Sequence, residues 1–122
     1  MRARARVVRP DAEAEHMTRE RCLILESWND ESDASVSVAR ARVAPGVTTE
    51  LHSLEVDERL VIVAGRGRVE VGELEPAAVA PGDVVVIPTG TAQRVTNDGD
   101  SDLVFYCVCT PRFRPDAYRA LE

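Results

Sequence analysis

Two residues near the middle of the chain have the side chains that proton transfer needs: His52, with an imidazole, and Glu58, with a carboxylate. A carboxylate in an apolar pocket beside a histidine suits acid–base chemistry, because burial raises the carboxyl pKa toward neutrality. His52 and Glu58 are therefore the catalytic candidates. Leu54 follows His52 by two positions, so on a strand both side chains face the same way.

The segments that would carry these residues are short and rich in branched apolar side chains. Glycine and proline separate them at close intervals, and helical periodicity is almost absent. This pattern is typical of an antiparallel sandwich or barrel. The predicted strands cover residues 1–8, 22–25, 36–43, 51–53, 60–64, 68–71, 77–80, 84–87, 93–96 and 103–109.

Three connecting segments carry predictions of their own. The Gly-Arg-Gly run at 65–67 predicts a tight hairpin turn between the strands on either side of it, because glycine tolerates positive φ. Residues 11–20 are charged and predict a short helix or a covering loop. The tail at 116–121 predicts one or two helical turns.

Two blocks in this part of the chain have a regular internal spacing. The first contains Gly46, His52, Leu54, Glu58 and Gly65, and the second contains Gly82, Pro88, Gly90, Gln93 and Asn97. Their spacing resembles the two cupin motifs, G-x5-H-x-H-x3,4-E-x6-G and G-x5-P-x-G-x2-H-x3-N. Leu54 and Gln93 stand where the motifs have their second and third histidines. The runs 36–49, 58–72 and 103–113 are also similar to those of small single-domain bacterial cupins with a type-2 cupin domain.

The resemblance implies an all-β fold, namely an antiparallel jelly-roll β-barrel with short N-terminal and C-terminal extensions. It implies a single cupin domain over residues 1–122, with the first motif at about 46–65 and the second at about 82–97. A length of 122 residues suits one domain with one core.

The resemblance also implies a metal site, because cupins gather four motif positions around one metal. Here the ligands would be His52, Glu58 and Gln93, and Leu54 would contribute none. The ion would be divalent, such as Zn, Fe, Ni or Mn, and held less tightly than by a full set, because an amide oxygen is a weaker ligand than an imidazole. The alternative is a metal-free network in which Glu58 accepts hydrogen bonds from His52 and Gln93.

The family hosts dioxygenases, isomerases, lyases, decarboxylases and cyclases, so the fold alone does not select a reaction. The histidine and carboxylate favour an isomerase, lyase or cyclase that acts on a small organic molecule in the barrel. Oxygen chemistry is less favoured, because it usually needs a redox metal with firmer ligation. The alternative function is a non-catalytic small-molecule binding or sensor protein without metal.

Arg40 and Arg42 lie two positions apart in an otherwise apolar segment, so they share one face of the predicted strand. The preferred interpretation places both on a solvated face. If that face lined the barrel instead, they would bind an anionic substrate or pair with a buried carboxylate. Arg40, Arg42 and Leu54 are therefore the candidate substrate-binding residues.

The three cysteines, Cys22, Cys107 and Cys109, are predicted to be reduced and buried. Their odd count favours a reducing compartment, so we expect a cytoplasmic protein. The net charge of −6 argues against nucleic acid as a partner, and no apolar run is long enough to cross a membrane. The alternating residues 2–8 could add to the sheet of a second copy, so we expect a homodimer.

Overall fold

The computed structural model describes residues 4–122, which contain eleven short strands and two 3₁₀ helices. Valine and isoleucine make up the strand at 84–87 and recur in the second half of the strand at 57–64, where their stiff side chains pack well on a pleated surface. The strands are β1 (His16–Met17), β2 (Leu23–Trp28), β3 (Ser37–Val43), β4 (His52–Leu54), β5 (Asp57–Ala64), β6 (Gly67–Val71), β7 (Ala77–Val79), β8 (Val84–Ile87), β9 (Gln93–Thr96), β10 (Leu103–Thr110) and β11 (Tyr118–Ala120). The 3₁₀ helices are η1 (Ala12–Ala14) and η2 (Pro115–Ala117).

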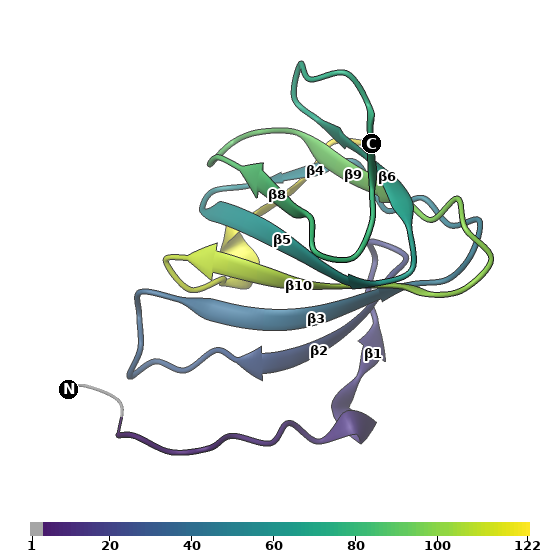
Figure 1. Ribbon diagram of the computed structural model, residues 1–122. Helices are drawn as coiled ribbons and strands as arrows, with labels where there is room; N and C mark the ends of the chain where they lie inside the picture. The colour runs from purple at the N-terminus through teal and green to yellow at the C-terminus, as the bar shows by residue number, and fades with distance from the viewer. Residues whose placement is uncertain (1–3) are drawn as a thin grey trace.

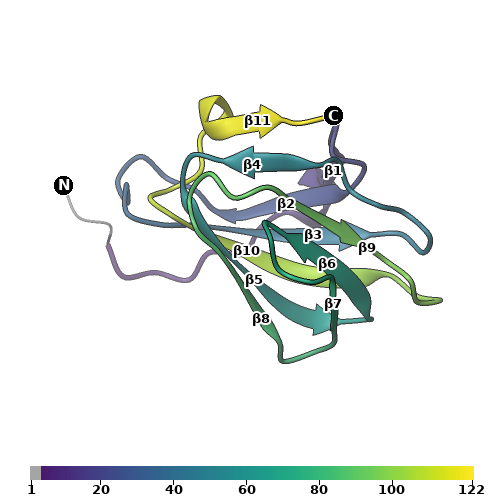
Figure 2. The ribbon, with the colours of Figure 1, turned by 90° about the horizontal axis from the view of Figure 1, so that it is seen from above.

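The strands form two antiparallel sheets. The six-stranded sheet has the order β1-β2-β3-β10-β5-β8, and Figure 1 shows its strands stacked from β2 to β8. The five-stranded sheet has the order β11-β4-β9-β6-β7, which is clear in the view from above (Figure 2). Strands that are distant in sequence, such as β3 and β10, pair side by side. This is a jelly-roll arrangement, and it confirms the predicted all-β fold class.

Alternation along the strands decides which side chains face the interior. In β5 the inward positions are Glu58, Leu60 and Ile62, and all three are buried. Ile62 joins Val43 and Leu103 in a core from which water is almost completely excluded. Burial of each such apolar side chain contributes about 1.5–3 kcal/mol to folding. Glu58 lies on the same inward face of β5 and is its polar residue, and its side chain lines a cavity between the sheets.

The predicted hairpin at residues 65–67 is wrong. β5 pairs with β10 and β8, while β6 pairs with β7 and β9, so this turn carries the chain from one sheet to the other. Gly65 does have a positive φ of 77°, but Gly67 is needed for close approach. A Cβ at Gly67 would lie 2.6 Å from the carbonyl oxygen of Thr96. The glycines of this turn therefore allow the chain to cross from one sheet to the other.

The two ends of the chain also depart from expectation. Residues 4–8 form no strand, and residues 1–3 of the predicted strand 1–8 lie outside the described residues. The predicted addition of residues 2–8 to the sheet of a second copy therefore lacks a strand at residues 4–8. The homodimer itself stays a prediction. The tail has its helical turn only in η2, and β11 then pairs with β4.

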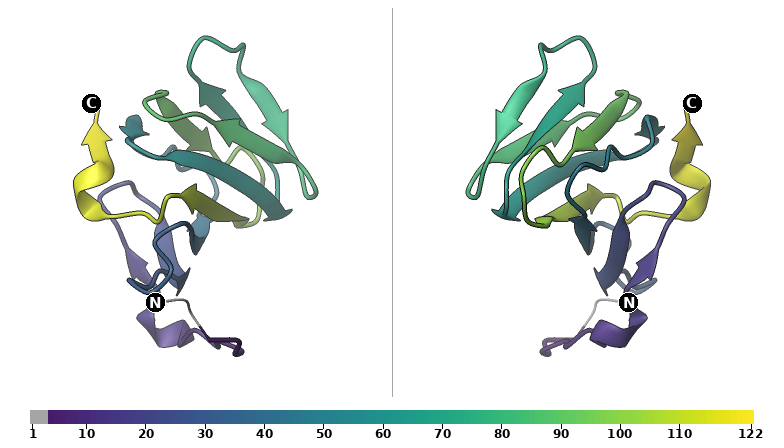
Figure 3. Two further views of the ribbon diagram at one scale, coloured as in Figure 1. Left: turned by 90° about the vertical axis from the view of Figure 1, so that its left-hand side faces the viewer. Right: turned by 90° about the vertical axis from the view of Figure 1, so that its right-hand side faces the viewer.

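Residues 11–20 contain the short 3₁₀ helix η1 followed by β1, which pairs with β2. Asp11 caps η1 by accepting a hydrogen bond from the backbone N–H of Glu13 at 2.9 Å. The N-terminal segment and η1 lie below the two sheets in the side views (Figure 3). The β1–β2 turn that follows carries Glu20, whose side chain faces the space between the sheets.

Within residues 4–122, the structure has no helix that combines the length and the apolar character needed to cross a bilayer.

Candidate functional site

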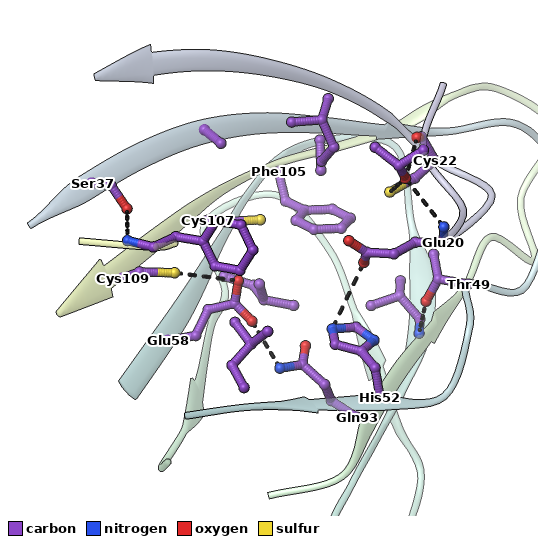
Figure 4. A pocket seen from close by; sticks show the side chains of 18 of the residues that line it. Glu20, Cys22, Ser37, Thr49, His52, Glu58, Gln93, Phe105, Cys107 and Cys109 are labelled. Carbon is purple, nitrogen blue, oxygen red and sulfur yellow. Dashed lines mark hydrogen bonds and ion pairs between the residues drawn. The ribbon is translucent and has the colours of Figure 1, made fainter. Parts of the chain in front are cut away.

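A cavity of about 170 Å³ lies between the two sheets. Most of its wall is apolar, and polar side chains reach it from both sheets and one turn (Figure 4). The apolar part includes Ile24, Ala41, Leu54, Leu60, Val95 and Phe105, and the polar residues that line it are His16, Thr18, Glu20, Glu26, Ser37, Thr49, His52, Glu58 and Gln93. A small, mostly apolar cavity with a few convergent polar groups is the usual form of a small-molecule site.

His52 presents one ring nitrogen to this cavity. Its Nδ1 lies 2.7 Å from the backbone carbonyl oxygen of Glu50, and because a carbonyl oxygen only accepts, Nδ1 carries the proton. Nε2 is then the nitrogen that is left to accept a proton from a ligand. The ring stacks on Tyr118 of β11, with centroids 4.8 Å apart and planes 15° apart, which fixes its orientation.

Glu20 lies beside His52, with its Oε2 3.7 Å from His52 Nε2. It comes from the β1–β2 turn, where the Thr18 hydroxyl donates to the Cys22 carbonyl and accepts from the Glu20 backbone N–H. Arg21 adopts a positive φ of 73° in this turn. Burial, and secondarily the nearby Glu50 carboxylate, raise the pKa of Glu20 to about 7. Near neutral pH, Glu20 can therefore both give and take a proton.

Glu58 is paired differently. Its Oε1 accepts a hydrogen bond of 2.8 Å from Gln93 Nε2, and its Oε2 accepts a longer one of 3.8 Å from the Cys109 thiol. Only 6% of Glu58 is exposed. Burial raises the pKa of this carboxyl, although the hydrogen bond from Gln93 and the charge of His52 oppose the shift. Glu58 is thus a buried carboxyl held in one orientation.

The structure brings the sequence-predicted residues together, because His52, Leu54, Glu58 and Gln93 all line the same cavity. The predicted network is right for Gln93 and Glu58 and wrong for His52, whose carboxyl neighbour is Glu20. The site therefore contains two separate polar pairs. His52 and Gln93 face each other across the β4–β9 ladder, so one backbone pairing positions one member of each pair.

These residues do not fit a metal ion well. The cavity offers the imidazole of His52 and the carboxylate of Glu58, but Gln93 turns its amide N–H₂ toward Glu58, and Leu54 is apolar. Among residues 4–122, no group of three or more His, Cys, Asp and Glu side chains is arranged to hold a metal ion. Four-coordinate catalytic sites usually draw three ligands from the protein. The predicted metal set of His52, Glu58 and Gln93 stays a prediction.

Arg40 and Arg42 lie outside the cavity, on the outer face that the preferred interpretation gave them, so the alternative that made them lumen-facing substrate ligands is wrong. Their neighbours Ala39 and Ala41 line the cavity, and strand alternation turns the arginines to the outer face. Both guanidinium groups form ion pairs with Glu15, whose side chain is only 12% exposed. They anchor the N-terminal segment to the outer surface of the sheet.

The cysteines also line the cavity. All three are free thiols, with Cys22 and Cys109 buried and Cys107 partly exposed. Cys107 and Cys109 face the same side, as their spacing in β10 predicts. Burial raises the pKa of all three thiols, to about 12 for Cys22 and Cys109, so they stay protonated and unreactive as nucleophiles.

Sequence reasoning missed Glu20 and the residues that support His52. The Tyr118 hydroxyl donates to Glu50 Oε1 at 2.5 Å, and Arg19 pairs with the same carboxylate at 3.1 Å. The hydrogen bond from Tyr118 lowers the pKa of Glu50. These residues come from the β1–β2 turn, the loop before β4 and the tail, and only Glu50 lies within a motif.

The fold and the cavity define a class of protein: a jelly roll with a cavity between its sheets. A model of the cupin domain matches residues 39–109, which is more than half of the chain and includes both motifs. The chain therefore belongs to the cupin domain family.

Among curated proteins, the chain is similar to the endoribonuclease YbeY of Myxococcus xanthus (strain DK1622), with 32% identity over 85 residues. The matched part is 70% of this chain but only 29% of the length of that protein.

Two solved structures show the same fold. A Cupin 2 conserved barrel domain protein from Salinispora arenicola CNS-205 is 23% identical and has a TM-score of 0.74, with 87% of this chain and 89% of that chain covered. A predicted oxalate decarboxylase from Thermotoga maritima is 21% identical and has a TM-score of 0.73, with 87% and 99% covered.

Proposed function

We propose that the chain is an enzyme of the isomerase, lyase or cyclase type that moves a proton on a small organic molecule held in the cavity. His52 is the base, and Glu20 is the group that exchanges protons with it. The observation that carries this proposal is the direction of the His52 ring: Nδ1 is committed to the Glu50 carbonyl, and Nε2 lies in the cavity beside Glu20.

The chemical step begins with a neutral His52 ring. Nε2 takes a proton from a carbon of the substrate, and the electron pair of that C–H bond stays on the substrate. The imidazolium that forms is stabilised by the Glu50 carbonyl at Nδ1–H and by the carboxylate form of Glu20 beside Nε2–H. Return of the proton to another substrate atom completes an isomerisation. In an elimination the electron pair forms a double bond and expels a leaving group from the neighbouring carbon, and in a cyclisation it forms the ring bond to an electrophilic atom of the same molecule. In both cases the proton passes through Glu20 to water or to the displaced group.

Glu58 and Gln93 orient the substrate in this proposal. Gln93 holds Glu58 in one rotamer, and both side chains are almost fully buried, so a polar group of the substrate meets a fixed partner. Leu54 and Phe105 form part of the apolar wall that keeps water away from the reacting carbon.

Deuterium wash-in tests the proposal without knowledge of the substrate. The protein is incubated in D₂O with pooled metabolites of at most roughly ten non-hydrogen atoms, a size suited to a cavity slightly larger than one that holds benzene. NMR then reports loss of individual C–H signals. We expect exchange at one position of one compound, lost in His52→Asn, which keeps a donor for the Glu50 carbonyl but has no counterpart of Nε2. Glu73→Gln, an exposed charge change, is the matched control.

A non-catalytic binder is the second candidate, supported by the largely apolar wall of the cavity. It predicts a compound that binds and shows no exchange. The names of the similar proteins do not replace either candidate. Endoribonuclease activity belongs to a protein of which the chain matches 29%, and an oxalate dianion would find no arginine or lysine in the described lining of this cavity.

A metal-assisted form of the proposal has its own test. Leu54→His with Gln93→His would restore the two histidines that the cupin motifs have at these positions, and imidazole nitrogen binds Zn²⁺ better than an amide does. We expect Zn²⁺ titration calorimetry to detect a tight site in the double variant and none of similar affinity in the natural protein. Equal affinity in the two proteins would show that the natural residues already form a metal site, and the proposed reaction would then include the metal.

A further inference from the structure

The charged side chains of the cavity are nearly all of one sign. Glu20, Glu26 and Glu58 line it, whereas no arginine or lysine of residues 4–122 does. Arg40 and Arg42 come from the strand that forms part of its wall, but they point outward to Glu15. Among the described residues that line the cavity, only the histidines His16 and His52 can carry a positive charge.

We infer that the ligand of this cavity is a small organic ammonium ion with an apolar body, whose ammonium group binds the carboxylate of Glu58. This inference rests on the proposed function and names its substrate class. Because Glu58 accepts one hydrogen bond from Gln93 and one from Cys109, about two of the four lone-pair sites of its carboxylate remain. An ammonium group has three N–H donors and can donate to both remaining sites.

The apolar lining suits the rest of such a ligand. Phe105 and Phe113 line the cavity, and an aromatic face attracts a desolvated cation. Leu54, Leu60 and Ile24 provide contact for a hydrocarbon or a ring. A known cavity of roughly 150 Å³ lined by apolar side chains holds benzene, so a cavity of about 170 Å³ admits one substituted ring.

An anionic ligand would meet the opposite conditions. Its charge would be buried beside Glu58 without a guanidinium or ammonium partner, and an unpaired buried charge is strongly disfavoured. Glu20 lies beside His52 at the other side of the same cavity and adds to the repulsion. The cavity therefore selects by charge as well as by shape.

Three probes of one shape test this inference: benzylamine, benzyl alcohol and benzoate, measured by titration calorimetry at pH 7.5. We expect benzylamine to bind at least about tenfold more tightly than benzyl alcohol, and benzoate to bind most weakly. Glu58→Gln should remove most of the preference for benzylamine and change the affinity for benzyl alcohol by less than about threefold. Glu73→Gln changes the net charge equally at an exposed position and should preserve the natural order.

The inference is overturned if benzoate binds as tightly as benzylamine, if benzylamine loses nothing in Glu58→Gln, or if none of the probes binds. Should Glu58→Gln fail to fold, the order of the three probes on the natural protein decides. The proposed function is judged separately, because deuterium wash-in on a neutral or anionic compound would support proton transfer and contradict the ammonium ligand. Binding of benzylamine without wash-in on any compound would do the reverse.

Discussion

The two polar pairs of the cavity differ in tightness. Gln93 donates to Glu58 at 2.8 Å, and both residues are almost fully buried. His52 and Glu20 are 3.7 Å apart, and 24% of the Glu20 side chain is exposed. A tight buried pair holds a group in place, whereas a loose and partly exposed pair can exchange a proton with water. In the function that we propose, the first pair therefore orients the substrate and the second transfers the proton.

Among the changes to the two pairs, loss of His52 Nε2 should have the largest effect, which we expect on the rate of proton transfer. His52→Asn keeps the hydrogen bond to the Glu50 carbonyl and removes the base, so the exchange rate measured by deuterium wash-in should fall about 10²–10⁴-fold. Stability should change little, because the replaced nitrogen makes only a long contact with Glu20. A variant that keeps its exchange rate would place the base elsewhere.

The tight pair should matter more for stability than for proton transfer. Gln93→Leu leaves Glu58 Oε1 buried without its donor, so the free energy of unfolding from urea titration should fall by about 1–3 kcal/mol. Gln93→Leu combined with Glu58→Leu removes both polar groups, and the double variant should lose less than the sum of the two single variants. Strict additivity would show that the 2.8 Å contact stabilises nothing.

The loose pair should make stability depend on pH. Burial raises the pKa of Glu20 from its ordinary value of 4.5 to about 7 in the folded protein, so the folded state holds more protons between these two pH values. The contribution of Glu20 to stability is therefore fully present below about pH 4.5 and is lost as the pH rises to about 7. Glu20→Gln should remove this loss, raising stability at pH 8 relative to pH 4.5 by about 3 kcal/mol more than Glu73→Gln does.

Urea titrations of the natural protein and both variants at the two pH values would measure this difference. A Glu20→Gln profile parallel to that of the natural protein would show that the carboxyl is as well hydrated in the folded state as in the unfolded chain.

The tight pair could be predicted from the sequence, and the loose one could not. Glu58 and Gln93 occupy motif positions whose strands have a fixed place in the jelly roll, so spacing alone brings them together. Glu20 lies upstream of both motifs, on a turn whose path depends on the positive φ of Arg21. A non-glycine residue in that conformation leaves no mark in the sequence, because glycine is the usual signal.

Strand alternation likewise predicted that Arg40 and Arg42 share a face, and the preferred interpretation placed that face outside, but the sequence left the lumen open as an alternative. Arg40 and Arg42 share one face of β3, and Ala39 and Ala41 share the other. Alanine is too weakly apolar to mark the inner face, and the deciding contact, Glu15, comes from a segment with no strand pattern. The turn at 65–67 failed for a related reason, since glycines allow a hairpin and a crossing between sheets equally well.

The protonation of His52 tests the central claim most directly. The chain has two histidines, so ¹⁵N–¹H correlation spectra of the rings can be assigned with a His16→Gln variant. The account predicts that His52 carries its proton on Nδ1 in the neutral ring, and that the Nε2 resonance shifts in Glu20→Gln and stays nearly unchanged in Glu58→Gln. A neutral ring protonated on Nε2, or a response to Glu58→Gln in place of Glu20→Gln, would contradict it.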